Sequence, residues 1–421
     1  MKEKKYKMNG YDALVYKTDK YTSLLASFMF EIDYTKENIT LCDYLADYML
    51  NTNKKYKRKH ELQKMIRTYY GMTISITNFN VGSKLFVEVG FLFLDPLLVK
   101  DDYLSDAIDF VHNYIFNPNF IDGRLDEYQK NESKKTLINY MGSHLSNPDV
   151  KANNEYRKSI GKNTYITTDV FDSKEEYEDL LNSFTDEDVI KMYHKVFDES
   201  FVGCVLMGNY SDDALKQMKE LFTFKKVREL DASYFEKLDF NLDNRDITIE
   251  DDSVNQSTLI VTYSINDYKE EDYFKYLAIK LALNYVGMVL HKVLREELKL
   301  VYNASANFNR RSGYINIRAY IDKDNKDKTI EGIDDILNRF KNVDYIKDLL
   351  LRGKKEVDLD AYTLDESESR LFDRTIQTKY KWKLPIEEQT KLFHSLTEQD
   401  IIDAINRLKK EEIFFYKGVK E

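Results

Sequence analysis

The chain has few of the residues from which proteins build local reactive centres. Its 421 residues include two cysteines and six histidines. No two histidines lie within five residues of each other, so no helix or hairpin can present a local pair of imidazoles. Zinc sites usually include ligands that are close in sequence. A zinc site in this chain would therefore have to be assembled entirely from distant residues.

Glycine and proline are also scarce, at 14 and 4 residues. The chain has neither a glycine-rich phosphate loop nor a Gly-x-Ser-x-Gly turn, so nucleotide binding and α/β-hydrolase chemistry have no local signature. The spacing of residues does not exclude a Ser/His/Asp triad that is assembled from residues far apart in the chain. No apolar run approaches the roughly 20 residues of a membrane span, and the basic N-terminus leads into no signal-peptide core. We therefore expect neither a signal peptide nor a membrane as partner.

Cysteine content and net charge indicate the compartment and the kinds of partner that we expect for the protein. Cys42 and Cys204 are far apart in apolar surroundings, and we expect buried, reduced thiols in a cytoplasmic protein. The formal net charge of −10 argues against nucleic acid as the main partner, because phosphate binding needs a basic surface. The length exceeds what one core usually serves, so two or more domains are expected.

The chain does contain an internal repeat. Residues 62–67 (LQKMIR) are echoed by residues 290–295 (LHKVLR), and Asn-Phe-Asn at 78–80 recurs at 307–309. Tyr-Leu-Ala at 44–46 recurs at 276–278. The three echoes keep the same order along the chain, which predicts two related halves and is too long in period for a solenoid.

Both halves mix strands and helices, which predicts an α+β fold. We expect an N-terminal domain over 1–221, a connector over 222–245 and a C-terminal domain over 246–421. Each domain should hold a mostly antiparallel sheet with helices packed on one face. Thr40 is the predicted N-cap of a first helix over 41–50, with Asp43 as its capping acid. Further predicted helices cover 58–69, 101–116, 122–145, 173–183, 185–197, 211–221, 270–298, 329–341, 345–357, 365–378 and 397–409. Predicted strands cover 13–17, 22–32, 72–79, 84–94, 200–208, 247–250, 257–265, 301–309, 313–320 and 413–416.

The order of elements, the repeat and several local strings resemble the M16 peptidases, most closely the M16B type. This resemblance implies two tandem domains of the LuxS/metallohydrolase-like fold. In that family one helix carries His-x-x-Glu-His, two zinc ligands around a general base. The corresponding string here begins at Asp43 and places Asp43 and Asp47 at the ligand positions and Ala46 at the base. The third ligand of the family is a glutamate on a later helix, for which Glu127 and Glu132 are candidates. The resemblance implies that this chain holds no metal.

The second half resembles the family in another motif. M16 enzymes carry an arginine and a tyrosine seven residues apart, which bind the substrate backbone and steady the tetrahedral oxyanion. Arg295 and Tyr302 keep this spacing. An arginine fork suits a peptide carbonyl or carboxylate, and a phenol suits a developing oxyanion. Gln256-Ser257, before the first long strand of this half, also resembles the family.

Each of these positions has a structural interpretation as well. Asp43 can be a capping acid and Asp47 an exposed helix residue, an interpretation that we favour over a divalent-cation site. Arg295 can pair with Glu296 or with a neighbouring helix, and Tyr302 can be an ordinary strand aromatic. Arg67 is the repeat counterpart of Arg295 and is expected to be structural, because no tyrosine follows it by seven residues.

The resemblance implies two hypotheses about function. In the first, the chain is a zinc-less subunit, inactive alone, that pairs with a zinc-bearing M16B subunit as in bacterial proteins encoded side by side. Arg295 and Tyr302 would then act in trans on a peptide substrate that adds as a strand to a sheet edge, and zinc would be bound only by the partner. In the second, the chain is a non-catalytic, homodimeric peptide-binding or scaffold protein. A third hypothesis is a pseudoenzyme that serves peptide maturation beside a biosynthetic cluster.

Overall fold

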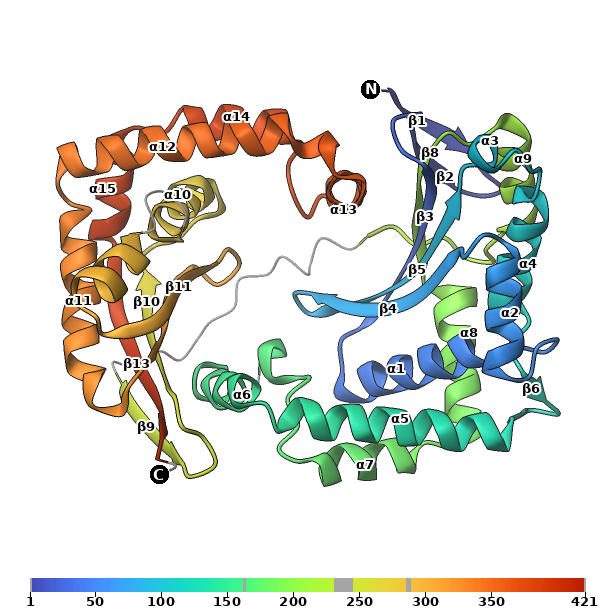
Figure 1. Cartoon of the computed structure of the whole chain (residues 1–421), viewed down its shortest axis with the longest axis horizontal. Coiled ribbons are helices and arrows are strands. Elements are labelled where there is room, and N and C mark those ends of the chain that lie inside the picture. The colour runs from blue at the N-terminus through green and yellow to red at the C-terminus, as the bar shows by residue number, and fades with distance from the viewer. Residues whose placement is uncertain (1, 162–163, 231–244, 285–288, 420–421) are drawn as a thin grey trace. The chain divides into compact units, whose positions relative to one another are not determined.

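The computed structural model describes residues 2–161, 164–230, 245–284 and 289–419, which fold as two compact units (Figure 1). Unit 1 consists of Met1–Ser146, Thr168–Tyr234 and Glu368–Trp382. Unit 2 consists of Asn147–Thr167, Phe235–Ser367 and Lys383–Glu421. Neither unit is one continuous stretch of the sequence, because residues 147–167 belong to unit 2 and residues 368–382 to unit 1. Most of the predicted connector over 222–245 lies outside the described residues, which resume at residue 245.

Unit 1 is built on a six-stranded sheet in the order β1-β2-β8-β3-β5-β4. The strands are β1 (Lys2–Lys7), β2 (Asp12–Lys17), β3 (Ser23–Asp33), β4 (Thr73–Val81), β5 (Lys84–Leu94) and β8 (Phe201–Gly208). All neighbours pair antiparallel except β2 and β8, which run parallel. A short hairpin of β6 (Phe120–Ile121) and β7 (Arg124–Leu125) lies outside this sheet.

Helices cover both faces of the unit 1 sheet. The helices are α1 (Lys36–Asn51), α2 (Lys59–Thr68), α3 (Pro96–Val99), α4 (Leu104–Phe116), α5 (Glu127–Leu145), α7 (Lys174–Ser183), α8 (Asp186–Glu199), α9 (Asp212–Leu221) and α13 (Glu368–Lys379). Alternate β3 residues such as Phe28 and Phe30 enter the main core with α1, α4, α8 and α9, because successive strand side chains point to opposite faces. Met29 on the other face packs with Ile376 of α13 and with Tyr380 just after it. The second face of this sheet is thus closed by a helix from the other half of the sequence.

Unit 2 is built on a five-stranded sheet in the order β11-β12-β10-β13-β9. The strands are β9 (Arg245–Asp251), β10 (Ser257–Ile265), β11 (Val301–Asn309), β12 (Tyr314–Ile321) and β13 (Leu408–Gly418). The α-helices are α6 (Pro148–Ile160), α10 (Tyr273–Asn284), α11 (Lys326–Arg339), α12 (Val343–Tyr362), α14 (Ile386–His394) and α15 (Glu398–Asn406). Short helical turns cover Tyr165–Thr167, Glu270–Asp272, His291–Glu297, Lys323–Asn325 and Leu364–Glu366. Helix α6 covers the second face through Ala152 and Tyr156, and the Tyr156 hydroxyl lies 2.8 Å from Thr262 Oγ1 of β10.

The two sheets repeat one topology. Without β1, the order β2-β8-β3-β5-β4 corresponds to β9-β13-β10-β12-β11, and in each sheet only the first pair is parallel. The sequence echoes fall in equivalent elements: residues 44–46 in α1 and 276–278 in α10, residues 78–80 in β4 and 307–309 in β11. This agreement supports the duplication predicted from the sequence and confirms the α+β fold with mostly antiparallel sheets.

Several predictions differ from the structure, including that of helices on only one face of each sheet. The first helix begins at Lys36, because Thr35 and not Thr40 is its N-cap; the Thr35 hydroxyl oxygen accepts a 3.1 Å hydrogen bond from the Asn38 N–H. The hydroxyl of Thr40 instead donates to the Lys36 carbonyl. The sequence pattern gave no prediction for α6 or α14. Asn147 caps α6 and Pro148 occupies its first turn, a helix-start signal that the pattern did contain.

The expectation for the two cysteines, Cys42 and Cys204, is confirmed in that both are buried and neither forms a disulfide. Among the described residues, no helix combines the length and the apolar character that crossing a bilayer requires.

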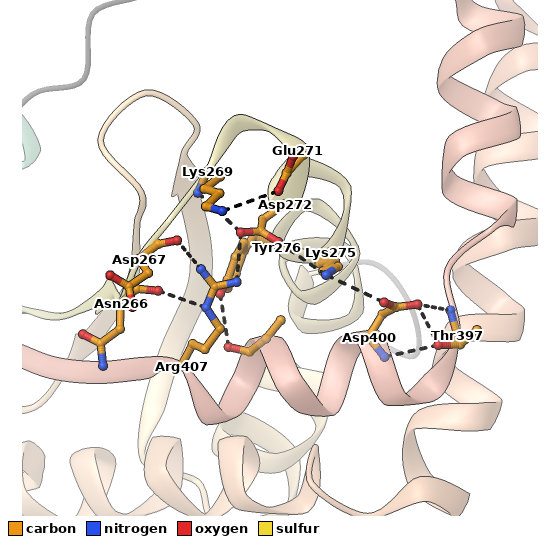
Figure 2. Close-up of polar contacts among 11 residues, drawn as sticks. Asn266, Asp267, Lys269, Glu271, Asp272, Lys275, Tyr276, Thr397, Asp400 and Arg407 are labelled. Atoms are coloured by element: carbon orange, nitrogen blue, oxygen red, sulfur yellow. Dashed lines mark hydrogen bonds and ion pairs between the residues drawn. The ribbon is translucent and has the colours of Figure 1, made fainter.

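Arg407 joins three segments of unit 2 (Figure 2). It follows α15, and its guanidinium donates to the backbone carbonyls of Asn266 and Asp267 at 2.9 and 2.5 Å and to the Asp272 carboxylate at 2.9 Å. Asp272 is buried and also pairs with Lys275 at 3.3 Å. Burial opposes ionisation of Asp272, but Arg407 and Lys275 outweigh it and lower the pKa of this carboxyl.

We expect Arg407→Ala to lower the free energy of unfolding by about 2 kcal/mol, because a buried carboxylate loses a charged donor and two carbonyls lose theirs. Urea unfolding followed by circular dichroism at pH 7 measures this change. Arg352→Ala is the matched control, because Arg352 forms only an exposed pair with Asp348 and should contribute less than about 0.5 kcal/mol. Equal losses in the two variants would contradict the role assigned to Arg407.

Candidate functional site

Asp43 and Asp47 lie in the middle of α1, four residues apart and therefore on one face of the helix. Both are only partly exposed. Asp43 Oδ1 accepts a 2.8 Å hydrogen bond from Asn78 Nδ2, which extends from the edge strand β4. The interpretation of Asp43 as a capping acid and Asp47 as an exposed residue is therefore wrong, because the helix starts one and a half turns earlier and this face packs against neighbours.

Burial controls the ionisation of both carboxyls. It raises the pKa of Asp43 to about 6, although the hydrogen bond from Asn78 favours the charged form. It also raises the pKa of Asp47, against opposing effects of Ser133, Lys59 and Asn51. A carboxylate that is removed from water without a cation beside it is costly to ionise. This face of α1 thus holds two acids without an adequate counter-charge.

Helix α5 runs beside α1 and forms a wall next to the acidic face of α1 (Figure 1). Its buried residues are Gln129 and Ser133, which are neutral. Gln129 Nε2 donates to Ser133 Oγ at 3.0 Å, and Ser133 hydrogen bonds to Asp47. Glu127 and Glu132, the predicted candidates for a third ligand, are exposed on α5 and do not belong to this wall.

These residues do not fit a catalytic zinc ion. Zinc in such sites takes imidazole, thiolate and carboxylate donors, usually three from the protein. Here the α1 face offers two carboxyls, Ala46 has no side chain that can act as a base, and α5 offers an amide and a hydroxyl. No group of three or more His, Cys, Asp or Glu that could hold a metal ion occurs within the described part of the chain.

Arg295 is exposed in unit 2 on a π-helical turn, His291–Glu297. The turn widens because the Leu298 N–H donates to the Val293 carbonyl, five residues back, at 3.0 Å. Arg295 Nη1 lies 3.2 Å from His291 Nε2. Because a guanidinium can only donate, Nε2 accepts, and the imidazole proton sits on Nδ1, 3.3 Å from Glu296 Oε1. The side chains of Arg295 and Glu296 therefore both contact His291. The direct ion pair between them that was considered from the sequence is not present.

Tyr302 is the second residue of the edge strand β11, and 54% of its surface is exposed. Its hydroxyl donates a 2.8 Å hydrogen bond to Asp322 Oδ1, which raises the pKa of the phenol. Between Arg295 and Tyr302 the chain turns through Lys299, whose φ of 55° is left-handed. Both side chains are accessible to a ligand, and Tyr302 is held in one direction by Asp322.

The sheet edges differ in charge. β1 carries Lys4, Lys5 and Lys7, and β9 carries acidic residues such as Asp246 and Glu250. Charged edge strands resist pairing with further strands. β4 (TISITNFNV) and β11 (VYNASANFN) form the opposite ends of their sheets and contain no charged residue. The uncharged edge strands are thus β4, which carries the Asn78 partner of Asp43, and β11, which carries Tyr302.

Sequence reasoning missed five polar residues of these sites. Asn78 could have been found, because it belongs to the Asn-Phe-Asn echo. Gln129 and Ser133 gave no signal, since glutamate was expected on that helix. His291 carried no motif of its own, and Asp322 lies 20 residues from its partner Tyr302.

Residues 183–356 match the sequence profile of the Peptidase M16 inactive domain. Over 426 residues the chain is 18% identical to the probable inactive metalloprotease YmfF of Bacillus subtilis, covering 99% of this chain and 98% of that protein. The chain is therefore similar in sequence to the M16 peptidases, and over residues 183–356 to their inactive domain. This similarity to inactive relatives agrees with the unsuitable zinc donors on α1 and α5.

Solved structures share the fold over the whole chain. A conserved protein from Enterococcus faecalis is 20% identical, with a TM-score of 0.81 and 98% of each chain covered. A protease from Helicobacter pylori is 13% identical, with a TM-score of 0.76 and 99% of each chain covered. At these identities the likeness concerns the fold of this chain and not its substrate.

Proposed function

We propose that this chain is a zinc-less M16 subunit that binds peptide together with a zinc-bearing M16 subunit and contributes Arg295 and Tyr302 to hydrolysis. The observation that carries the proposal is the contrast between its two candidate sites. The α1 face has Asp43, Ala46 and Asp47 beside a neutral wall of α5, whereas Arg295 and Tyr302 remain exposed. Such a chain can bind and orient a peptide but has no group of its own to activate water.

Peptide binding is supported by the uncharged edges β4 and β11. An extended peptide that adds to a sheet edge is held by main-chain hydrogen bonds, so its sequence matters little for affinity. A peptide on β11 would run beside Tyr302 at the start of the strand. Arg295, just before that strand, could donate to a carbonyl or carboxylate of the same peptide.

The chemistry of hydrolysis would be divided between the subunits. A zinc ion in the partner supplies a Lewis acid and a bound water of lowered pKa. The Tyr302 hydroxyl can donate to an oxyanion once it leaves Asp322, and the Arg295 guanidinium can hold the backbone in place. His291 would act as a positioning residue, because its Nε2 accepts from Arg295.

The metal content of the isolated chain tests this proposal. After incubation with a molar excess of zinc at pH 7.5 and desalting, we expect far less than one zinc per chain and no cleavage of a mixed peptide library. The reason is that two carboxyls without imidazole or thiolate hold zinc weakly. One tightly held zinc per chain would contradict the proposal, as would peptidase activity that a chelator abolishes.

A further inference from the structure

A hollow of about 490 Å³ lies in unit 1 between the loop after α1, helix α2 and helix α4. Its apolar wall consists of Tyr56, Met65, Tyr69 and Phe110. The ring centroids of Tyr56 and Tyr69 lie 5.8 and 5.5 Å from that of Phe110, at tilted angles. A hollow of this size lined by aromatic side chains suits a small organic ligand.

Charges of both signs line the same hollow. Lys54 and Lys55 come from the loop, and Asp106 and Asp109 come from α4. Asp109 accepts a 3.0 Å hydrogen bond from Gln217 Nε2, whereas Asp106 forms no hydrogen bond or ion pair with any residue that the structure describes. The Lys55 ammonium lies 5.1 Å from the centroid of the Tyr56 ring, so this wall already accepts a cation on a ring face.

Tyr69 is close enough to both kinds of charge to be affected by each. Burial raises the pKa of its phenol, Asp106 raises it further and Lys55 lowers it. A ligand that lies against Tyr69 in this hollow would therefore be near both a carboxylate and an ammonium group.

The loop that forms one wall is fixed before any ligand binds. Asn53 Oδ1 accepts hydrogen bonds from the N–H groups of Lys55 and Tyr56 at 3.0 and 2.6 Å. The Lys54 N–H donates to the Asn117 carbonyl at the end of α4, at 2.9 Å. A wall that is already ordered costs little conformational entropy on binding, which favours affinity for a small ligand.

We propose that this hollow binds a small zwitterion of the amino-acid type with an apolar side chain. The ammonium group of the ligand pairs with Asp106, its carboxylate lies toward Lys54 and Lys55, and its apolar part packs on Tyr56, Tyr69 and Phe110. A free amino acid and the product dipeptide of a peptidase share this chemistry. None of these residues belongs to the α1 face or to the Arg295 site, so the inference does not depend on pairing with a zinc-bearing subunit.

Isothermal titration calorimetry of the full chain tests the proposal with four probes: phenylalanine, leucine, the dipeptide Phe-Phe and N-acetylphenylalanine amide. We expect saturable binding of at least one of the first three and at least about tenfold weaker binding of the amide, which has lost both charges. If a free amino acid binds more tightly than the dipeptide, free amino acids are the source of the ligand. If the dipeptide binds more tightly, the source is a peptidase product. No saturable heat for these three up to about 10 mM, or equal binding of the amide, would overturn the proposal.

Variants locate the site. Asp106→Asn and Tyr69→Ala should each weaken binding of the best probe about tenfold, and Lys55→Gln should weaken it for the zwitterion but not for its methyl ester. Glu132→Gln and Arg67→Gln are matched controls, because neither residue lines the hollow, and they should leave Kd unchanged. Asp106 is exposed, so its substitution keeps the fold intact even if Tyr69→Ala unfolds α2. Unchanged affinity in Asp106→Asn would overturn the assignment.

Discussion

Arg295→Ala should lower kcat/KM for peptide cleavage by the pair formed with a zinc-bearing M16 subunit by about 10²–10³-fold, and Tyr302→Phe should do the same mainly through kcat. The arginine is expected to bind the peptide backbone in both ground and transition state, so its loss should raise KM as well. The phenol is expected to donate only to the developing oxyanion, so its loss should leave KM nearly constant. Steady-state kinetics on one fluorogenic peptide separates the two effects.

Arg67 provides the matched control for Arg295. It occupies the equivalent place in the repeat, is exposed on α2 and has no tyrosine seven residues later. Arg67→Ala should leave kcat/KM within about twofold, since only transition-state contacts change the rate. If Arg295→Ala and Tyr302→Phe also leave the rate unchanged in a pair that still assembles, these residues have no role in hydrolysis.

Asp43→Asn should stabilise the protein at pH 7 by up to about 3 kcal/mol. The pKa of this carboxyl is raised from 3.8 to about 6, so the folded state binds the proton more tightly than the unfolded chain. The stabilisation from that proton is fully present below pH about 4 and is lost as the pH rises through about 6. The amide variant cannot ionise and still accepts the hydrogen bond from Asn78, so it keeps its stability over this range.

Urea unfolding at pH 4, 5, 6 and 7 measures this linkage. The gain of Asp43→Asn over the natural chain should grow from pH 4 to pH 6 and then level off. Glu132→Gln, an exposed carboxyl on α5, is the control and should show no such rise. A variant that is less stable than the natural chain at pH 7 would show that the Asp43 carboxylate is stabilised by a partner, as a bound cation would do.

Much of the fold could be predicted because periodicity and repeats report on buried faces. The strands β3, β5 and β10 and the helices α2, α8 and α15 lie close to their predicted ranges, since long apolar patterns are set by the core. The start of α1 was wrong because two threonines, Thr35 and Thr40, both precede helical residues, and only the backbone geometry decides which one caps. No sequence signal indicates that α6 belongs to unit 2 and residues 368–382 to unit 1, because the apolar pattern of a helix does not say which sheet the helix covers.

The site was predictable only where chemistry depends on spacing. Asp43, Ala46 and Asp47 do share one helix face, because an i, i+4 spacing fixes that arrangement. Arg295 and Tyr302 are both exposed, one on each side of a turn. The partners of these residues were not predictable: Asn78 and Ser133 reach the α1 face, and Asp322 binds Tyr302, through contacts between strands and helices far apart in sequence.

Titration of this chain into a fixed amount of the zinc-bearing M16 subunit, with the initial rate of peptide cleavage as readout, tests the central claim most directly. The proposed division of labour predicts almost no rate for either chain alone, a rate that rises linearly to a plateau at one chain per zinc subunit, and a plateau at least about 100-fold lower with the Arg295→Ala variant. A zinc-bearing subunit that is fully active alone, with a rate unaffected by this chain, would contradict it.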